Sequence, residues 1–382
     1  MSHSSSRRGR PARYLVQALA ACCRQPLGRG CKASRADHYV KCYGSVGFAL
    51  ALISHFLLGV RSLRELTAEL QVNTRLGRLT GLRGISKAQL PKLLQARPVE
   101  LWTPLLASLL RRVPAAQVPA GVRVLDTTFL AMGCTLFARQ HPTVRCTPHT
   151  AGYKAGVVWD LQRALPLKLV CRAGQSNDAQ YLDELLAPAE DLDGLFYLFD
   201  RGFRKYAAWD ELLDRGAGFL TRAWHKLHFA LAQQVPLDPA SPEIVADEIG
   251  YVGGGRFRMR HRLRRITVLT AHEPIVFLTS DLERPAVELT ELYRCRWQIE
   301  LFFRWLKRVL DCRKSLGMSE AAALHTLCAA LACYLLLLIF AAQVLPESDS
   351  GGLRGQKIAL RILRSKAYEP PGRALLRCLG FS

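Results

Sequence analysis

The sequence predicts an α/β protein in which strands and helices alternate in the central part, with a β-rich insertion and a helical N-terminal region. Two observations support this fold class. Hydrophobic residues make up 49% of the 382 residues, which is enough for two or three domains with substantial cores. Beyond about residue 120, the helical spacing of apolar residues gives way to short apolar runs typical of strands.

We expect residues 38–119 to be helical. Residues 46–58 are dominantly apolar, and segments 62–65 and 86–89 both have the spacing of a capping box before a helix. Two short capped helices among arginines fit a helix-turn-helix-like DNA-binding region. They fit a helical dimerisation or packing module equally well.

Residues 120–345 are expected to form one domain that begins with strands. The run from Val122 to Asp126 is of β type and ends in a carboxylate, and a buried central strand is expected to end at Asp200. The other expected elements are strands at 134–138, 153–161 and 218–221, with 165–171 as an extension or partner of the strand at 153–161, and helices at 177–186 and 206–213. The chain order of strand, two strands, helix, strand, helix and strand is that of a ribonuclease H-like domain.

Residues 222–286 are expected to form a β-rich insertion in this domain. The run from Arg256 to Arg265 alternates arginines with apolar residues, as a strand with one basic face would. Such a face can follow a phosphate backbone, and the alternative is a solvated edge strand protected by its charge. The overall charge of the chain favours contact with DNA.

The balance of charged residues indicates a polyanionic partner. The chain carries 53 Lys and Arg against 31 Asp and Glu, so its net charge is +22, which suits DNA or RNA. The 12 cysteines include no CxxC pair and no paired metal-ligand spacing, which argues against structural zinc and against a disulfide framework. Several lie in apolar runs, as in a reduced cytoplasmic protein.

Both ends of the chain are expected to lie outside the folded domains. Residues 1–37 should be a basic, disordered tail, in which segment 8–11 resembles the AT-hook core that enters a DNA minor groove. A basic arm with non-specific phosphate attraction is the simpler interpretation. Residues 346–382 should be a basic C-terminal tail. The apolar stretch 321–345 is long enough to cross a membrane, but its polar residues predict a buried core helix and no membrane.

Four residues near the end of the domain share one narrow face of a predicted helix, within about 60° at 100° per residue. They are Tyr293, Arg296, Glu300 and Lys307. One carboxylate amid two cations and a phenol suits a metal-dependent site that acts on a nucleic acid backbone. An amphipathic helix with a solvated charged face explains the same pattern.

Three carboxylates are expected to converge in this domain. Asp126 and Asp200 end neighbouring strands, and Glu300 lies on the helix. Hard divalent cations prefer such oxygen ligands, and a pair about 3.5–4 Å apart can activate a water or a 3′-hydroxyl and stabilise the leaving oxygen. We therefore take all three as candidate catalytic residues and metal ligands, although each Asp taken singly also suits a cap or a surface acid.

These features resemble the DDE transposases of bacterial insertion sequence family 4, named for its YREK signature. The resemblance rests on Leu125-Asp-Thr-Thr128, on Asp200-Arg-Gly-Phe203, and on the Tyr-x2-Arg-x3-Glu-x6-Lys spacing from 293 to 307. It covers roughly residues 39–345 and does not extend to the two tails.

The resemblance implies a DNA transposase that binds the terminal inverted repeats of its element, cleaves DNA strands and transfers them to target DNA. It implies two Mg²⁺ ions per active site, replaceable by Mn²⁺, with the three carboxylates as ligands. Tyr293, Arg296 and Lys307 would bind DNA near the cleavage point. Because two ends are cut together, it also implies a homodimer in a synaptic complex, in the bacterial cytoplasm and associated with the nucleoid.

Two other functions remain compatible with the sequence. A decayed or repurposed element would be a DNA-binding protein without catalysis, and flanking inverted repeats would argue against it. A structure-selective ribonuclease H-like nuclease would share the metal chemistry. Such a nuclease would cut branched or hybrid substrates whatever the repeat sequence.

Overall fold

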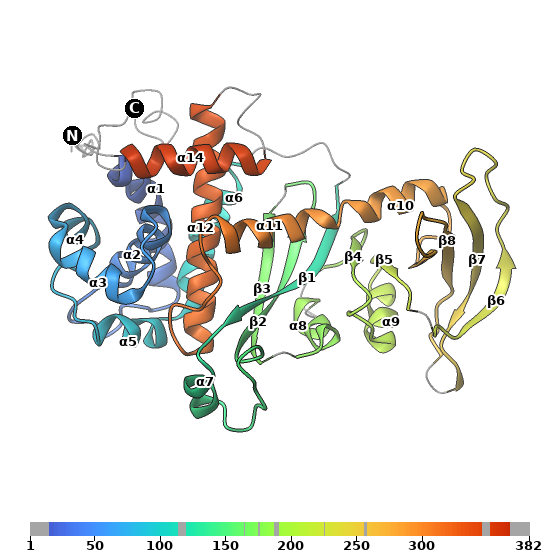
Figure 1. The fold of residues 1–382 in the computed structure, drawn as a ribbon, viewed down its shortest axis with the longest axis horizontal. Coiled ribbons are helices and arrows are strands. Elements are labelled where there is room, and N and C mark those ends of the chain that lie inside the picture. The colour runs from blue at the N-terminus through green and yellow to red at the C-terminus, as the bar shows by residue number, and fades with distance from the viewer. Residues whose placement is uncertain are drawn as a thin grey trace, which may run out of the picture. The chain divides into compact units, whose positions relative to one another are not determined.

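The structure is a computed structural model that describes residues 15–113, 120–163, 165–174, 176–186, 191–224, 226–255, 258–345 and 352–366. These residues form two compact units (Figure 1). The helical unit contains the described residues up to Val113 and from Trp305 onward, and the sheet unit contains those between. The sheet unit ends at Arg304, whereas the predicted domain 120–345 ends later. The difference arises because the chain after Arg304 packs with the N-terminal helices.

The core of the helical unit is the long helix α12 (Glu320–Val344), which packs against the apolar helix α2 (Ser45–Leu58). By itself α12 is long and apolar enough to cross a membrane, but 89% of its most apolar window is buried within the structure, as in a core helix. The other described helices of this unit are α1 (Leu15–Ala33), α3 (Leu63–Val72), α4 (Thr74–Thr80), α5 (Gln89–Ala96), η1 (Val99–Trp102), α6 (Thr103–Leu110) and α14 (Gly352–Lys366).

Two segments that we expected to be tails contain helices of this unit. Within the predicted disordered tail 1–37, helix α1 buries Leu19, Cys23, Leu27 and Cys31. Residues four apart lie on one helix face, so this apolar stripe packs against α2 and α6. Helix α14 lies within the predicted C-terminal tail and packs against α12. The AT-hook-like segment 8–11 falls outside the described residues.

Both predicted capping boxes form. Ser62 Oγ accepts a hydrogen bond from the Glu65 backbone N–H at 3.1 Å where α3 begins. Before α5, Ser86 Oγ accepts one from the Gln89 N–H at 3.3 Å, and Gln89 Oε1 accepts one from the Ser86 N–H at 2.9 Å. These bonds satisfy N–H groups that a helix start leaves without partners. A DNA-binding role for these helices stays a prediction.

The helical unit buries a neutral histidine. Trp102 Nε1 donates to His325 Nδ1 at 2.7 Å, and His325 Nε2 lies 3.0 Å from the Arg97 carbonyl oxygen. Accepting at one ring nitrogen and donating at the other requires the neutral imidazole. Burial lowers the pKa of His325 to about 4, against a smaller opposing effect of the Arg97 carbonyl.

The sheet unit is built on a nine-stranded sheet in the order β3-β2-β1-β4-β5-β9-β8-β7-β6. Strand β1 pairs antiparallel with β2 and parallel with β4, which in turn pairs parallel with β5. The strands are β1 (Val122–Ala131), β2 (Gly152–Asp160), β3 (Leu165–Ala173), β4 (Phe196–Phe199), β5 (Gly218–Arg222), β6 (Phe229–Gln234), β7 (Ile244–Val252), β8 (Leu263–Val268) and β9 (Ile275–Thr279). The described helices are α7 (Cys134–Gln140), η2 (Asp178–Tyr181), α8 (Leu182–Leu185), α9 (Tyr206–Asp214), α10 (Ala286–Arg294) and α11 (Trp297–Arg308), the last of which continues into the helical unit.

The prediction of a strand at residues 134–138 is wrong, because this segment lies in helix α7. A helical turn places Phe137 and His141, four residues apart, against Tyr153 of β2. The rings of Phe137 and Tyr153 are 5.9 Å apart, and His141 Nε2 lies 2.8 Å from the Tyr153 hydroxyl. The helix predicted at 177–186 is also shorter than expected, since it consists of the 3-10 turn η2 followed by α8.

Four strands, β6 to β9, lie within residues 222–286, where we expected a β-rich insertion. Strand β9 pairs antiparallel with β5, so these strands extend the sheet. The arginine run does not form one basic strand: β8 begins only at Leu263, and residues 256–257 lie outside the described part of the chain. Three of its arginines are paired with acids: Arg260 with Asp214, Arg264 with Asp247 and Arg265 with Glu248.

The buried His325 predicts a loss of stability in mild acid. The folded-state pKa near 4 lies below the usual value of 6.5, so the contribution of His325 to stability is full above pH 6.5 and declines as the pH falls. Between pH 7 and 5 this loss should be about 2 kcal/mol. Urea unfolding of the wild type and of His325→Gln should show a steeper decline in the wild type. Equal declines would contradict this role.

The pair of Arg264 and Asp247 predicts a second effect on stability, because both side chains are only 4% exposed. Removing one partner leaves a buried charge without compensation, so Asp247→Ala should lower the free energy of unfolding by about 3–5 kcal/mol. The control is Glu248→Ala on the same strand, whose pair with Arg265 is more exposed and should contribute about 1 kcal/mol or less. Similar losses in the two variants, measured by thermal or urea unfolding, would contradict the prediction.

Candidate active site

Two parallel strands place Asp126 and Asp200 side by side. The last residue pair of β1 and β4 is Leu125 with Phe199, and each aspartate is the next residue along the chain. Asp200 follows the end of β4, but Asp126 lies in the middle of β1, so the prediction that this strand ends at Asp126 is wrong. Neighbouring strands lie about 4.8 Å apart, and equivalent residues of paired strands face the same side of a sheet. The Asp126 carboxylate accepts a hydrogen bond from the Thr127 N–H at 2.7 Å, and that of Asp200 from the Gly202 N–H at 2.5 Å.

The aspartates project from the face that α11 covers. Trp159 of β2 pairs with Val124 of β1, and its ring packs against Phe302 of α11 with the centroids 4.6 Å apart. Because Val124 and Asp126 are two residues apart on β1, both point toward α11. On the opposite face, a Cβ at Gly156 would lie only 2.7 Å from the Tyr181 ring, so the glycine permits close packing of η2.

Arg296 joins Asp126 to Glu300. Its Nη1 lies 3.5 Å from Asp126 Oδ2, and its Nη2 lies 2.5 Å from Glu300 Oε1. The helix predicted to carry all four signature residues is broken here: α10 ends at Arg294, α11 begins at Trp297, and Arg296 lies in the turn between them. The prediction that these four residues share the face of one continuous helix is therefore wrong. The turn nevertheless brings Arg296 between the two acids.

Burial and neighbouring charges alter the acidity of Asp126. Burial raises the pKa of Asp126 to about 7, and the negative charges of Asp200 and Glu300 add to the rise. The Thr127 N–H and the Arg296 guanidinium act in the opposite direction. Such a site disfavours its own negative charge and would be stabilised by cations.

Tyr293 is buried next to the end of β4. Its hydroxyl lies 3.4 Å from the carbonyl oxygen of Phe199, the residue before Asp200, and its ring packs edge-on against Phe277. Burial raises the pKa of Tyr293 to about 12, so its phenol stays protonated. In this structure Tyr293 supports the end of β4, and a role in DNA binding stays a prediction.

Lys307 is the one signature residue that belongs to the helical unit. It lies in the last turn of α11, beyond the boundary after Arg304, and its carbonyl oxygen accepts a hydrogen bond from Arg313 Nε at 3.0 Å. The sheet unit thus contains the three carboxylates together with Tyr293 and Arg296. A DNA-binding role for Lys307 also stays a prediction.

The donor chemistry of the site fits divalent cations, but its geometry is not that of a formed metal centre. Three carboxylates are the hard oxygen ligands that Mg²⁺ and Mn²⁺ prefer. Within the described residues, however, no three His, Cys, Asp or Glu side chains are gathered closely enough to hold an ion. The Arg296 guanidinium lies between Asp126 and Glu300, where a cation would have to bind.

Two charged residues beside the site were not singled out from the sequence. Lys154 of β2 and Asp178 of η2 form an ion pair at 2.7 Å, and Asp178 also binds the Thr127 hydroxyl at 2.7 Å. The strand Gly152–Asp160 is otherwise mostly apolar. A lysine at a poorly exposed position of such a strand requires an acidic partner, and that signal was available in the sequence.

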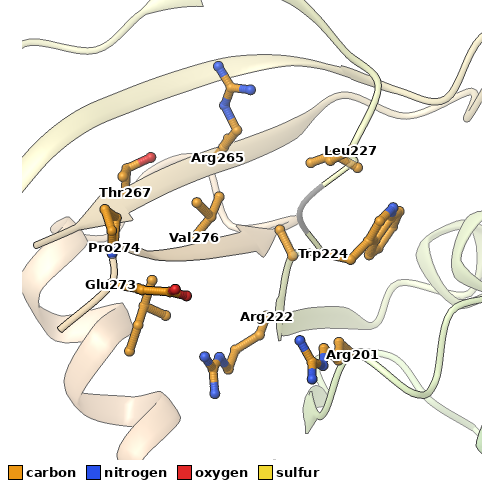
Figure 2. Close-up of a pocket in the computed structure, with 11 residues that line it drawn as sticks. Arg201, Arg222, Trp224, Leu227, Arg265, Thr267, Glu273, Pro274 and Val276 are labelled. Atoms are coloured by element: carbon orange, nitrogen blue, oxygen red, sulfur yellow. The ribbon is translucent and has the colours of Figure 1, made fainter. Parts of the chain in front are cut away.

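A cavity of about 800 Å³ lies beside the strand ends and is lined by arginines (Figure 2). Arg201, which follows Asp200, and Arg222, at the end of β5, contribute to its wall together with Trp224. Neither arginine forms an ion pair within the part of the chain that the structure describes, although Glu273 lines the same cavity. Because Arg201 directly follows Asp200, the cavity adjoins the site.

Comparison with known proteins identifies the family. The profile of the transposase DDE domain matches residues 119–336. A Sinorhizobium fredii protein named as a transposase, y4zB, is 32% identical over 254 residues, which cover 64% of this chain and 68% of that protein. The protein named as the transposase of insertion sequence element IS5377 of Geobacillus stearothermophilus is 23% identical over 268 residues, covering 68% of this chain and 69% of that protein.

One solved structure, the piggyBac transposase synaptic complex with hairpin DNA, aligns with 97% of this chain and 85% of its own at 13% identity and a TM-score of 0.47. That score is too low to identify the fold. The family match, in contrast, extends over more than half of the sequence and includes Asp126, Asp200 and Glu300. The chain therefore belongs to the family of transposase DDE domains.

Proposed function

We propose that this protein is the DNA transposase of a bacterial insertion sequence of family 4, acting through Asp126, Asp200 and Glu300. It would bind the terminal inverted repeats, cleave DNA strands there and transfer the freed 3′-hydroxyl to target DNA. The observation that carries this proposal is the register of β1 and β4, which sets two aspartates side by side on the face of Arg296 and Glu300. The ribonuclease H-like chain order supports it.

The three carboxylates would hold two Mg²⁺ ions, with Mn²⁺ as a substitute. When bound, such ions supply an activated water or 3′-hydroxyl and stabilise the leaving oxygen. The carboxylates provide the negative charge that such cations would balance, and burial together with the neighbouring acids raises the pKa of Asp126 to about 7.

Arg296 has two sets of possible partners, which supports a coupling between DNA binding and metal binding. Without DNA its guanidinium is bound to Asp126 and Glu300. A guanidinium binds phosphate in the same forked geometry as carboxylate, so a DNA strand would compete for it. Transfer of Arg296 to the DNA would free the carboxylates for cations. The enzyme would then become fully assembled only on its substrate.

The remaining partners follow from the charges around the site. Arg201 and Arg222 line the cavity beside Asp200 and would hold the phosphate backbone on either side of the cleavage point, with Lys307 as a further phosphate ligand. Because two element ends are cut together, we propose a homodimer in the synaptic complex. Its place of action would be the nucleoid in the bacterial cytoplasm.

Substitution of Asp126, Asp200 or Glu300, here called the triad, is expected to abolish DNA cleavage. With Mg²⁺ and DNA carrying the element's own ends, Asp126→Asn, Asp200→Asn and Glu300→Gln should each reduce nicking by at least about 100-fold, because each removes a metal ligand. Nicking is followed on end-labelled DNA. Asp183→Asn, which removes an exposed carboxylate paired with Lys205, is the control and should cut normally. Cleavage retained by all three triad variants would overturn the proposal, and absence of cleavage by folded wild type would favour a non-catalytic DNA-binding protein.

Substitution of Arg296 is expected to strengthen metal binding and to weaken DNA cleavage. In the absence of DNA, Arg296→Gln should bind Mn²⁺ roughly tenfold more tightly than the wild type, since the competing cation is gone. Its nicking activity should fall, because the phosphate contact is lost. Mn²⁺ binding is measured by electron paramagnetic resonance, with the exposed Arg294→Gln as the matched control. Unchanged Mn²⁺ affinity in Arg296→Gln would exclude the proposed competition.

A further inference from the structure

A fourth carboxylate, that of Asp178, lies behind the two catalytic strands. Its Oδ1 accepts a hydrogen bond from the Thr127 hydroxyl at 2.7 Å and lies 2.7 Å from Lys154 Nζ. Thr127 follows Asp126 on β1, and the two side chains point to opposite faces of the sheet. Asp178 therefore contacts the same short stretch of β1 as the catalytic site, but from the α8 side.

The other oxygen of Asp178 lies against the turn that carries Asp200. A Cβ on Gly202 would lie 2.6 Å from Asp178 Oδ2 and 2.9 Å from Asp200 Oδ1. The two carboxylates therefore approach the same glycine. The Gly202 N–H is the hydrogen-bond donor to Asp200 Oδ1 at 2.5 Å, so this turn sets the direction of the Asp200 carboxylate.

Lys154 allows this acid to lie close to the triad. Its side chain is 16% exposed, and its Nζ donates to the Ser176 carbonyl oxygen at 2.9 Å besides pairing with Asp178. The Asp178 side chain is 25% exposed. A poorly exposed carboxylate beside another acid would repel it, and the lysine on β2 offsets that repulsion.

We propose that Asp178, held by Lys154, is a positioning residue that sets the relative placement of Asp126 and Asp200. It binds β1 next to the first aspartate and lies against the turn of the second, so it connects the two strand ends independently of the sheet hydrogen bonds. Residues that hold metal-binding carboxylates in place typically change metal affinity or activity by about 10–100-fold when altered. This inference rests on the proposed function.

The test is the Mg²⁺ dependence of nicking by Asp178→Asn. The Mg²⁺ concentration at half-maximal nicking should rise roughly tenfold, and high Mg²⁺ should restore much of the rate. Mn²⁺ binding to the protein on precleaved end DNA, measured by electron paramagnetic resonance, should weaken in parallel. A merely structural role would lower the folded fraction without moving either midpoint. Asp183→Asn in the neighbouring helix, with the same change of charge, should move neither.

Two further variants keep the inference testable if Asp178→Asn fails to fold. Thr127→Val removes only the hydrogen bond and should raise the Mg²⁺ midpoint several-fold, because one such bond contributes about 1 kcal/mol. Lys154→Met should have no added effect in an Asp178→Asn background, since the lysine acts through the acid. A Lys154→Met variant with weakened DNA binding and an unchanged Mg²⁺ midpoint would assign the lysine to DNA and overturn the inference.

The failure of this inference is distinct from failure of the proposed function. If the wild type nicks DNA with Mg²⁺ and the folded Asp178→Asn and Thr127→Val proteins match its midpoint, only the role of Asp178 is overturned. If the wild type neither nicks its element ends nor binds Mn²⁺ on them, the transposase function fails, and the role of Asp178 fails with it.

Discussion

The parallel pairing of β1 with β4 is the constraint on which the rest of the site depends. All four residues of β4 are buried, and the Tyr197 and Phe199 side chains belong to the same core cluster as Leu125 of β1. Sliding one strand by a single residue would turn these side chains to the wrong face. The core thus fixes the register, and the register places Asp126 beside Asp200. The position of the two aspartates is thus a consequence of the hydrophobic packing of the residues that directly precede them.

The concentration of acids created by this pairing is balanced by cations on both faces of the sheet. Arg296 binds two of the triad residues from the α11 side, and Lys154 binds Asp178 from the α8 side. The two cations differ in their surroundings. Lys154 Nζ contacts two oxygens of its own unit, one from the Asp178 carboxylate and one from the Ser176 carbonyl group, whereas Arg296 contacts two carboxylates that we propose as metal ligands. In the function that we propose, Arg296 would exchange these partners for DNA, whereas Lys154 would keep its own.

The net charge of +22 is not distributed as the sequence alone indicates. In the insertion, three arginines of the densest run are paired with acids on a neighbouring strand or helix, and Arg264 is buried. Arg201 and Arg222, which lie outside that run, line the cavity together with Glu273 and form no ion pair among the described residues. A count of charges indicates a nucleic acid partner, but only the fold shows which of the charges are available to it.

The sequence by itself determined the features that depend on local physics. Both capping boxes, the strand that ends just before Asp200, and most of the alternation of strands and helices follow from short-range patterns of apolar and capping residues, whereas β1 continues beyond Asp126 to Ala131. Tertiary structure decided whatever depends on distant partners. The break between α10 and α11 places the guanidinium of Arg296 against Asp126 of a distant strand. The segment 134–140, which contains the predicted strand 134–138, is helical and packs against Tyr153. Asp178 meets Thr127 across 51 positions of the chain. No local pattern encodes such contacts, because their energies arise only when the sheet has brought the two segments together.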